Sequence, residues 1–374
     1  MANLVLKGEK GKNEHYHYVV DPHSRPLGSG GMGQVLRGQK VNEDTGTSTE
    51  VAIKFLYDDL PLNVIDRARK EASIQINNDN LVEMREFLVI TEEINGTPVK
   101  RYHVVSELLR GVRLLDLLKG ENTDFEGNEV AFATELSQRY HDDRESTAVF
   151  IIKNILSGIM ALHDYGYIHR DIDPSNIMVT SEKKIKIIDY GLVKKIDSVK
   201  ESQDAQLTYA GQFVGKVAYA APELVAGDIE HQNVTTDFYA IGILLYRLIV
   251  GSLPFDGTKA EVMRMQLQES LPLEKVSNPQ IREIIRKATE KKQEDRYQSA
   301  SEFRVALEHL KLNEENNLSN EDAEDYESED SGNSDGYYEP SKPSKSNDTL
   351  KNVAIWGGAI LAGGLLGALL RLVI

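Results

Sequence analysis

Cysteine is absent from all 374 residues of the chain. Without it the chain has neither a disulfide framework nor a thiolate metal site, and this composition suits a reducing compartment. Positive charge is also scarce, because 43 Lys and Arg stand against 59 Asp and Glu for a formal net charge of −16. Such acidity argues against nucleic acid as a partner. Residues 1–7 lack a basic region leading into a long apolar core, so we expect no signal peptide.

Hydrophobic residues, in contrast, make up an ordinary 40% of the chain, which is typical of a globular protein. The length suffices for a two-lobed domain with additional segments. Residues 1–15 are polar and lysine-rich, and we expect them to form a loose leader. Alternating apolar residues from Tyr16 onward predict the first strand.

One short run of residues, 169–176, carries most of the chemistry and has the sequence HRDIDPSN. Asp171 and Asn176 lie five residues apart, so a tight loop can aim both side chains into one site. Two apolar runs follow, and the second ends on Asp189. This pattern predicts a strand-turn-strand hairpin with one carboxylate before its first strand and another after its second strand. Carboxylate and amide oxygens are the ligands that Mg²⁺ selects, together with phosphate and water.

The pattern HRDxxxxN followed by Asp189-Tyr190-Gly191 resembles the catalytic and metal loops of the protein kinase family. The resemblance implies that Asp171 orients the substrate hydroxyl and accepts its proton. It also implies that Asn176 and Asp189 bind Mg²⁺.

A glycine-rich run, residues 27–35, matches the kinase pattern GxGxxGxV. Residues without a Cβ allow phosphates to approach the backbone closely. A lone GxGxxG is also compatible with a dinucleotide-binding turn or a flexible loop, but the predicted strand at residues 34–41 favours the kinase hairpin. The residues expected to bind ATP here are Leu27, Gly28, Ser29, Gly30, Gly31, Met32, Gly33, Gln34 and Val35.

The next predicted strand carries the sequence VAIK, in which Ala52 and Lys54 resemble the kinase nucleotide site. Lys54 would reach the α- and β-phosphates of ATP. Glu71, on a helix predicted from about residue 62 to 76, is the candidate partner of Lys54. Glu83 and Glu86 are rivals for that role, but they fall in the following strand.

Residues 102–109 resemble the last small-lobe strand and the hinge of a kinase. The adenine of ATP would then bind backbone groups at Glu107 and Leu109, with Ser106 at the back of the pocket. Residues 120–146 are the least family-like part of the domain, and we expect an enlarged, solvated connection between the first two large-lobe helices, with a role in specificity as the alternative. The apolar spacing over residues 147–163 predicts a helix that leads to the catalytic loop.

The activation segment should span residues 192–220. Arg170 resembles the family arginine that pairs with a phosphorylated activation loop, and the candidate phosphorylation sites are Ser198, Ser202 and Thr208. Two structural contacts are expected from the family as well. Asp237 should tie its helix to the backbone of the catalytic loop, and Glu223 should form a buried ion pair with Arg296.

Two positions depart from the family pattern. Asp173 stands where serine/threonine kinases usually have a lysine that contacts the transferring phosphate, and Lys216 stands where they usually have a threonine. Our hypothesis is that Lys216 reaches back to pair with Asp173 and returns positive charge to the site, because phosphoryl transfer depends on such stabilisation. The alternative is a degraded site in a pseudokinase.

The composition changes sharply after Leu312. Residues 312–352 are acidic, rich in Asn and Ser and poor in aliphatic residues, which predicts a disordered linker. Residues 353–374 are apolar except for Arg371 and are long enough to cross a bilayer. We expect a C-terminal membrane anchor that leaves the kinase domain in the cytoplasm, although a helix packed on the protein or on a partner is an alternative. Ala359, Gly363 and Gly367 share one helix face, which favours close pairing of two such helices and a homodimer.

The sequence therefore predicts an α+β, two-lobed protein kinase fold with a leader (1–15), a kinase domain (16–311), a linker (312–352) and a transmembrane helix (353–374). The small, β-rich lobe would span residues 16–109 and the larger helical lobe residues 110–311. The expected function is transfer of phosphate from ATP, with Mg²⁺, to Ser and Thr of protein substrates and of the kinase itself. The alternatives are a membrane-anchored pseudokinase scaffold that binds nucleotide or partners, and a functional membrane helix that the kinase regulates.

Overall fold

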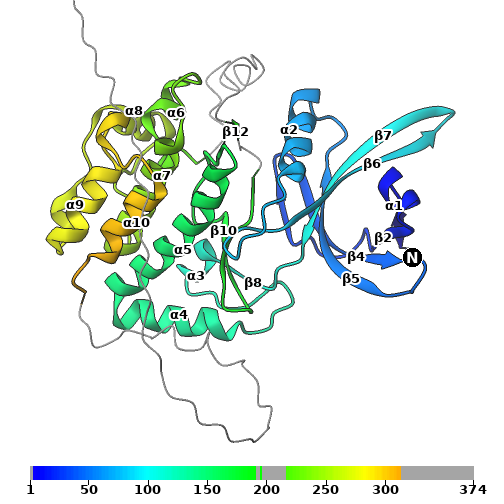
Figure 1. The fold of residues 1–374 in the computed structure, drawn as a ribbon, viewed down its shortest axis with the longest axis horizontal. Coiled ribbons are helices and arrows are strands. Elements are labelled where there is room, and N and C mark those ends of the chain that lie inside the picture. Colours follow the sequence, from blue (N-terminus) through cyan, green and yellow to red (C-terminus); the bar gives the residue numbers. More distant parts are fainter. Residues whose placement is uncertain (1–2, 191–193, 196–215, 313–374) are drawn as a thin grey trace, which may run out of the picture. The chain divides into compact units, whose positions relative to one another are not determined.

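The structure is a computed structural model that describes residues 3–190, 194–195 and 216–312. The predicted linker after residue 312 and the predicted transmembrane helix lie outside these residues. The described chain has two lobes joined near residue 109, a β-rich one drawn in blue and cyan and a helical one drawn in green to orange (Figure 1). The predicted two-lobed arrangement is therefore present.

The small lobe is built on a seven-stranded antiparallel sheet in the order β1-β2-β4-β5-β7-β6, with β3 paired to β4. Its core collects the inward-facing members of alternating strands, among them Tyr18, Leu36 and Ile53. The strands of this sheet are β1 (Leu4–Leu6), β2 (Tyr16–Val20), β3 (Gly28–Gly30), β4 (Gly33–Asn42), β5 (Ser48–Leu56), β6 (Met84–Ile94) and β7 (Thr97–Glu107).

The start of the chain does not behave as the expected leader. β1 pairs with β2, Leu6 is buried in the core of the small lobe, and a short helix α1 (Glu9–Asn13) follows. The expectation of a loose segment over residues 1–15 is wrong because Leu4, Val5 and Leu6 are enough to add an edge strand to a sheet that already exists. Polar composition elsewhere in the segment hid this short apolar run.

The hairpin between β6 and β7 turns at Asn95-Gly96. Both residues have positive φ angles, 52° and 77°, the geometry for which an Asn-Gly pair is preferred. Helix α2 (Leu62–Ser73) lies against this part of the sheet and ends three residues earlier than predicted. It ends there because Ile74 takes an extended backbone, and both Ile74 and Ile76 are buried outside the helix.

The large lobe is organised around α5 and α7, which are among its longest helices and contact each other. Two small sheets, β8-β10-β11 and β9-β12, complete this lobe. β11 contacts the small lobe through a bridge between Ile187 and Leu81. The elements of this lobe are β8 (Gly111–Arg113), α3 (Leu114–Leu117), α4 (Ala131–Asp142), α5 (Arg144–Asp164), β9 (Tyr167–Ile168), β10 (Ile177–Thr180), β11 (Ile185–Ile187), β12 (Lys194–Lys195), η2 (Val217–Tyr219), α6 (Pro222–Ala226), α7 (Val234–Val250), α8 (Lys259–Gln268), η3 (Leu273–Lys275), α9 (Pro279–Ala288), η4 (Gln293–Asp295) and α10 (Ala300–Glu308).

The expected solvated loop at residues 120–146 is wrong in its second half. Residues 131–142 form α4, which buries Phe132, Ala133 and Leu136 against the large lobe. The helix α5 then begins at Arg144 rather than Thr147, with the side chain of Asp143 accepting a hydrogen bond from the Ser146 amide. Charged residues on the outer face of α4 obscured its narrow apolar stripe.

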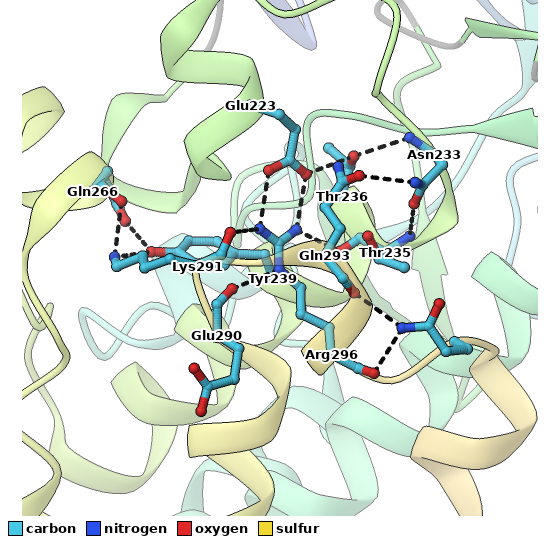
Figure 2. A network of polar contacts seen from close by, with 11 residues as sticks. Glu223, Asn233, Thr235, Thr236, Tyr239, Gln266, Glu290, Lys291, Gln293 and Arg296 are labelled. Atoms are coloured by element: carbon cyan, nitrogen blue, oxygen red, sulfur yellow. Dashed lines mark hydrogen bonds and ion pairs between the residues drawn. The ribbon is translucent and has the colours of Figure 1, made fainter. Parts of the chain in front are cut away.

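The expected ion pair between Glu223 and Arg296 is present and buried (Figure 2). Two guanidinium nitrogens of Arg296 donate to the two carboxylate oxygens of Glu223 at 2.8 and 3.0 Å. Thr236 donates to the same carboxylate, and Arg296 also donates to the backbone carbonyls of Glu290, Thr235 and Lys291. The pair thus fixes the start of α6 to the chain before α10.

Within the described residues, α5 alone is long and apolar enough to span a bilayer by length and composition. More than half of its apolar window is buried inside the large lobe, so it is a core helix.

Candidate active site

A cavity of about 660 Å³ is lined by both lobes. Its walls come from the glycine-rich hairpin β3–β4, from β5, from residues 106–109 and from the loop before β10. The sequence-predicted residues that line it are Leu27, Gly28, Ser29, Gly30, Gly31, Met32, Gly33, Val35, Ala52, Lys54, Glu71, Glu107, Leu109, Asp171, Asn176 and Asp189. Ser106 lines it too, as expected.

Gln34 is the member of the glycine-rich run that does not line this cavity, although it was expected to bind ATP. It lies on β4 between Gly33 and Val35, both of which do. Successive side chains on a strand point to opposite faces, so Gln34 faces away from the cavity.

Lys54 lies between two carboxylates at the inner end of the cavity. Its Nζ is 4.0 Å from Glu71 Oε2 and 3.9 Å from Asp189 Oδ1. The Glu71 carboxylate raises the pKa of Lys54, so its charge is retained despite burial. Burial raises the pKa of Glu71, and Lys54 opposes that shift. Of the three candidate glutamates, Glu71 is therefore the one that the structure pairs with Lys54.

Tyr190 holds the neighbouring Asp189 in this arrangement. Its hydroxyl donates to the Val82 carbonyl at 2.9 Å, and its ring packs edge-on against His169. Its amide lies 3.4 Å from Glu71 Oε1. These contacts bury the tyrosine without leaving its hydroxyl unpaired, which would be costly.

The catalytic loop sets the geometry of Asp171 and Asn176. The Asn176 amide nitrogen donates to the Asp171 carbonyl and to Asp171 Oδ2, both at 2.9 Å. Burial raises the pKa of Asp171 to about 7, with Asp173 and Asp189 adding to the shift.

The backbone of this loop is held from below by Asp237. Its carboxylate accepts hydrogen bonds from the amides of His169 and Arg170 at 2.8 and 2.7 Å, as expected, and it also bonds to His163 at 2.8 Å. Arg170 takes a positive φ of 68°, an unfavourable conformation for a residue with a Cβ. The buried carboxylate stabilises that conformation.

Asp173 and Lys216 meet in the structure. Lys216 Nζ lies 2.5 Å from Asp173 Oδ1 and also bonds to the Ser175 hydroxyl. Asp173 is buried, and its Oδ1 accepts from the amide and hydroxyl of Ser175 at 2.6 and 2.7 Å. Neither Asp173 nor Lys216 lines the cavity itself. The pairing on which the charge-swap hypothesis depends is therefore present, beside Asp171.

The donor set fits a magnesium ion held together with phosphate. Because the Asn176 amide nitrogen is bound to Asp171, its amide oxygen is left for another partner. Asp189 supplies a carboxylate to the same cavity. In the described part of the chain no group of three or more His, Asp or Glu side chains could hold a metal alone. Such a sparse protein contribution is what Mg²⁺ takes when phosphates supply further ligands.

The family match agrees with the arrangement of these site residues. The family model described as "Protein kinase domain" covers residues 22–309. The chain belongs to the protein kinase family.

Bacterial kinases are among its relatives. The chain is 29% identical over 313 residues to the serine/threonine-protein kinase PrkC of Bacillus subtilis, covering 80% of this chain and 42% of PrkC. It is 29% identical over 289 residues to the probable serine/threonine-protein kinase PknB of Lactococcus lactis, covering 75% of this chain and 40% of that protein. The chain thus spans about two fifths of the length of the curated relatives it matches.

Two features of this kinase site were missed from the sequence. The Glu107 side chain accepts from Lys186 Nζ at 2.5 Å and from the Glu83 amide at 2.8 Å, which braces the hinge against β11. Residues 121 and 123–125, from the supposedly solvated insertion, line the nucleotide cavity. No motif signals either feature, because both depend on segments that are distant in sequence.

Other expectations fall on residues that are not described. Ser198, Ser202 and Thr208 lie there, so the expected pairing of Arg170 with a phosphorylated activation segment stays a prediction. Within the described chain, Arg170 donates to Gln232 at 3.0 Å.

Proposed function

We propose that this chain is an active serine/threonine protein kinase that transfers the γ-phosphate of ATP to hydroxyls of protein substrates, including its own. The observation that carries the proposal is the convergence of Lys54, Asp171, Asn176 and Asp189 on one cavity lined by both lobes. The two bacterial relatives described above are named as serine/threonine-protein kinases, which supports the same class of acceptor.

In this proposal each residue has a distinct task. Lys54 binds the phosphates and is held by Glu71, while backbone groups of Glu107 and Leu109 bind the base. Asn176 and Asp189 hold Mg²⁺, which when bound neutralises charge on the phosphates. Asp171 orients the acceptor hydroxyl and takes its proton as the hydroxyl oxygen bonds to the γ-phosphorus. The bond from phosphorus to the bridging oxygen then breaks and ADP leaves.

The proposed role of Lys216 is to supply the cation that the catalytic loop lacks. The loop itself, residues 171–176, contains no lysine or arginine. The bond from Lys216 to Asp173 neutralises a buried carboxylate beside Asp171 and brings an ammonium to the edge of the site. Without that cation, the negative charge of Asp173 would repel the phosphates of ATP. A pseudokinase scaffold could tolerate this repulsion because it transfers no phosphate.

The proposal is tested by measuring label transfer from γ-labelled Mg·ATP to the full chain and to added protein. We expect label on Ser or Thr, lost in Asp171→Asn. A natural chain that binds Mg·ATP but transfers no phosphate would overturn the proposal in favour of the pseudokinase scaffold.

The charge swap has its own test in the same assay. Lys216→Thr should slow transfer by about tenfold or more, because charge stabilisation at the transferring phosphate is lost. The double variant Asp173→Lys/Lys216→Thr should recover much of the rate. Lys275→Thr, which removes an exposed lysine of the large lobe, is the matched control. Unchanged transfer in Lys216→Thr would refute the swap.

We further propose that residues 353–374 tether the kinase to a membrane and that the tether favours pairing of two copies. The support is compositional: an apolar run with only Arg371 charged, small residues four apart at Ala359, Gly363 and Gly367, and lysines on its N-terminal side. Pairing at the membrane would bring one active site close to the activation segment of another copy.

A further inference from the structure

The insertion between α3 and α5 contains an ordered turn at residues 122–130, called the strap below. Asp124 organises it, because its carboxylate accepts hydrogen bonds from the amides of Glu126 and Asn128 at 2.8 and 2.9 Å. Its amide donates to the Asn128 carbonyl at 2.8 Å, and Gly127 adopts the positive φ of 86° that the turn requires. A further backbone bond joins Val130 to the Asn122 carbonyl. The strap is therefore a built turn rather than a loose loop.

The strap is anchored in the large lobe at its base. Asn122 donates to the hydroxyl of Thr134, and that hydroxyl donates to Glu129, at 2.8 and 2.7 Å. Thr134 lies on α4, whose apolar face is buried in the large-lobe core. The tip of the strap is thus held on a rigid base.

The tip reaches the nucleotide cavity. Thr123, Asp124 and Phe125 line it together with the hinge and the glycine-rich hairpin. The ring centroid of Phe125 lies 5.8 Å from the guanidinium carbon of Arg110, which directly follows the hinge. Phe125 is therefore an aromatic wall at the hinge side of the cavity mouth, in a part of the chain that carries no kinase motif.

Glu126, next to Phe125, ties the strap to the small lobe. Its carboxylate pairs with Arg37 on β4 and with Arg110 at 3.6 Å. Glu50 on β5 completes the ring by pairing with Arg37 and, at 2.9 Å, with Arg110. Two arginines and two glutamates thus alternate around one four-membered network.

The register of the sheet explains why this network forms at the cavity mouth. Arg37 is two residues from Val35 on β4, and Glu50 is two residues from Ala52 on β5. Residues two apart on a strand share a face, so Arg37 and Glu50 extend the cavity-facing side of the sheet beyond Val35 and Ala52. Glu126 meets them there from the large lobe.

We propose that Phe125 is a nucleotide-contacting residue of this kinase, and that Glu126 is a positioning residue that holds Phe125 at the cavity by pairing with Arg37 and Arg110. The inference rests on the proposed function in that the cavity binds Mg·ATP. It extends the proposed nucleotide site by a contact residue, Phe125, that comes from the insertion between α3 and α5.

The network should have a modest but measurable effect. Its four side chains are between 32% and 39% exposed, and exposed ion pairs contribute little one at a time. Loss of Glu126 removes two pairs at once and allows Phe125 to spend time away from the cavity, which lowers the binding-competent fraction. The effect should appear in nucleotide affinity and in KM for ATP, not in kcat.

The experiment measures the Kd of Mg·ATP for the full chain by direct binding, alongside melting without nucleotide. We expect Phe125→Ala to raise Kd about fivefold and Glu126→Gln about threefold, with unchanged melting temperatures. Glu126→Gln should have no further effect on Kd in a Phe125→Ala background, because Glu126 acts through Phe125. The threefold effect should shrink at high salt, which screens the network.

The matched control is Glu135→Gln, which removes the same charge from an exposed position on α4. It should bind Mg·ATP as the natural chain does. Natural affinity in Glu126→Gln, equal losses in Glu135→Gln and Glu126→Gln, or a full additional loss in the double variant would overturn the inference. Direct binding separates it from phosphotransfer: a chain that binds but does not transfer refutes only the proposed catalysis, whereas a natural chain that binds no Mg·ATP refutes both.

Discussion

The contact between Asp173 and Lys216 explains two departures from the family pattern at once. An unpaired buried carboxylate is costly, and Asp173 is buried within the loop that must approach the phosphates. The ammonium of Lys216 and the amide and hydroxyl of Ser175 all converge on its Oδ1. Local chemistry therefore accounts for why both departures from the family pattern are tolerated together.

His103 is a second residue with an unusual environment, and it leads to a pH prediction. It is buried on β7 against the Phe55 ring, and neither of its ring nitrogens has a hydrogen-bond partner. Burial lowers its pKa to about 4; the charge of Arg101 adds to this shift and that of Asp58 opposes it. As the pH falls, His103 therefore takes up a proton near pH 6.5 in the unfolded chain but only near pH 4 in the folded chain. The free energy of unfolding therefore decreases as the pH falls through this window.

Replacing His103 with Leu should remove that dependence. Between pH 7 and pH 4 the natural chain should lose up to about 3 kcal/mol more unfolding free energy than His103→Leu, since each unit of pKa shift corresponds to about 1.4 kcal/mol. Chemical denaturation at several pH values measures this difference. His23→Leu, at an exposed histidine, should keep the natural slope. Parallel pH profiles for the natural chain and His103→Leu would contradict the assignment.

At the scale of the element, the β3–β4 hairpin uses its glycines for two different reasons. A Cβ on Gly33 would lie 2.0 Å from the Phe55 carbonyl oxygen, so this glycine is required by close packing against β5. A Cβ on Gly30 would meet nothing within 4 Å. That open space lies at the cavity, where phosphates would approach.

Replacing these two glycines with alanine should therefore affect different properties, stability at Gly33 and nucleotide binding at Gly30. Gly33→Ala should lower the unfolding free energy by about 1–3 kcal/mol, the usual cost of overpacking. Gly30→Ala should change it by less than about 0.5 kcal/mol and instead raise KM for ATP. Thermal melting and steady-state kinetics of the two variants give the comparison. An unchanged KM for ATP in Gly30→Ala would show that the open space at Gly30 has no bearing on nucleotide binding.

At the scale of the whole molecule, several contacts join the two lobes besides the chain connection, and some of them lie around the cavity. Lys54 and Glu71 approach Asp189, Lys186 braces Glu107, and Glu126 pairs with Arg37. Each of these contacts borders the cavity or its hinge. Nucleotide binding and the relative position of the lobes should therefore be coupled.

The chain beyond residue 312 supports a prediction about location. The full chain should sediment with lipid vesicles, and a chain ending at residue 352 should remain in solution, because burying some twenty apolar residues in a bilayer is strongly favourable. Both chains should bind Mg·ATP equally, since the compact unit at residues 1–317 is common to both. Recovery of the full chain in the supernatant would refute the membrane tether.

The sequence by itself determined the two lobes, the order of most of their elements and half of the residues that line the cavity. It could do so because strand alternation, helical spacing and short motifs are local properties, and residues such as Asp171 and Asn176 lie within one loop. The buried pair of Glu223 and Arg296 was also predictable, but only because the family resemblance supplied the partner. Short apolar signals, as in β1 and α4, were lost among the charged residues around them.

Only the tertiary structure decided which distant side chains meet. It selected Glu71 over its rivals, turned Gln34 away from the cavity, and brought the strap to Arg37 across 89 residues of sequence. Such contacts depend on how sheets and helices pack, and packing sums many weak, non-directional interactions that leave no local pattern in the chain.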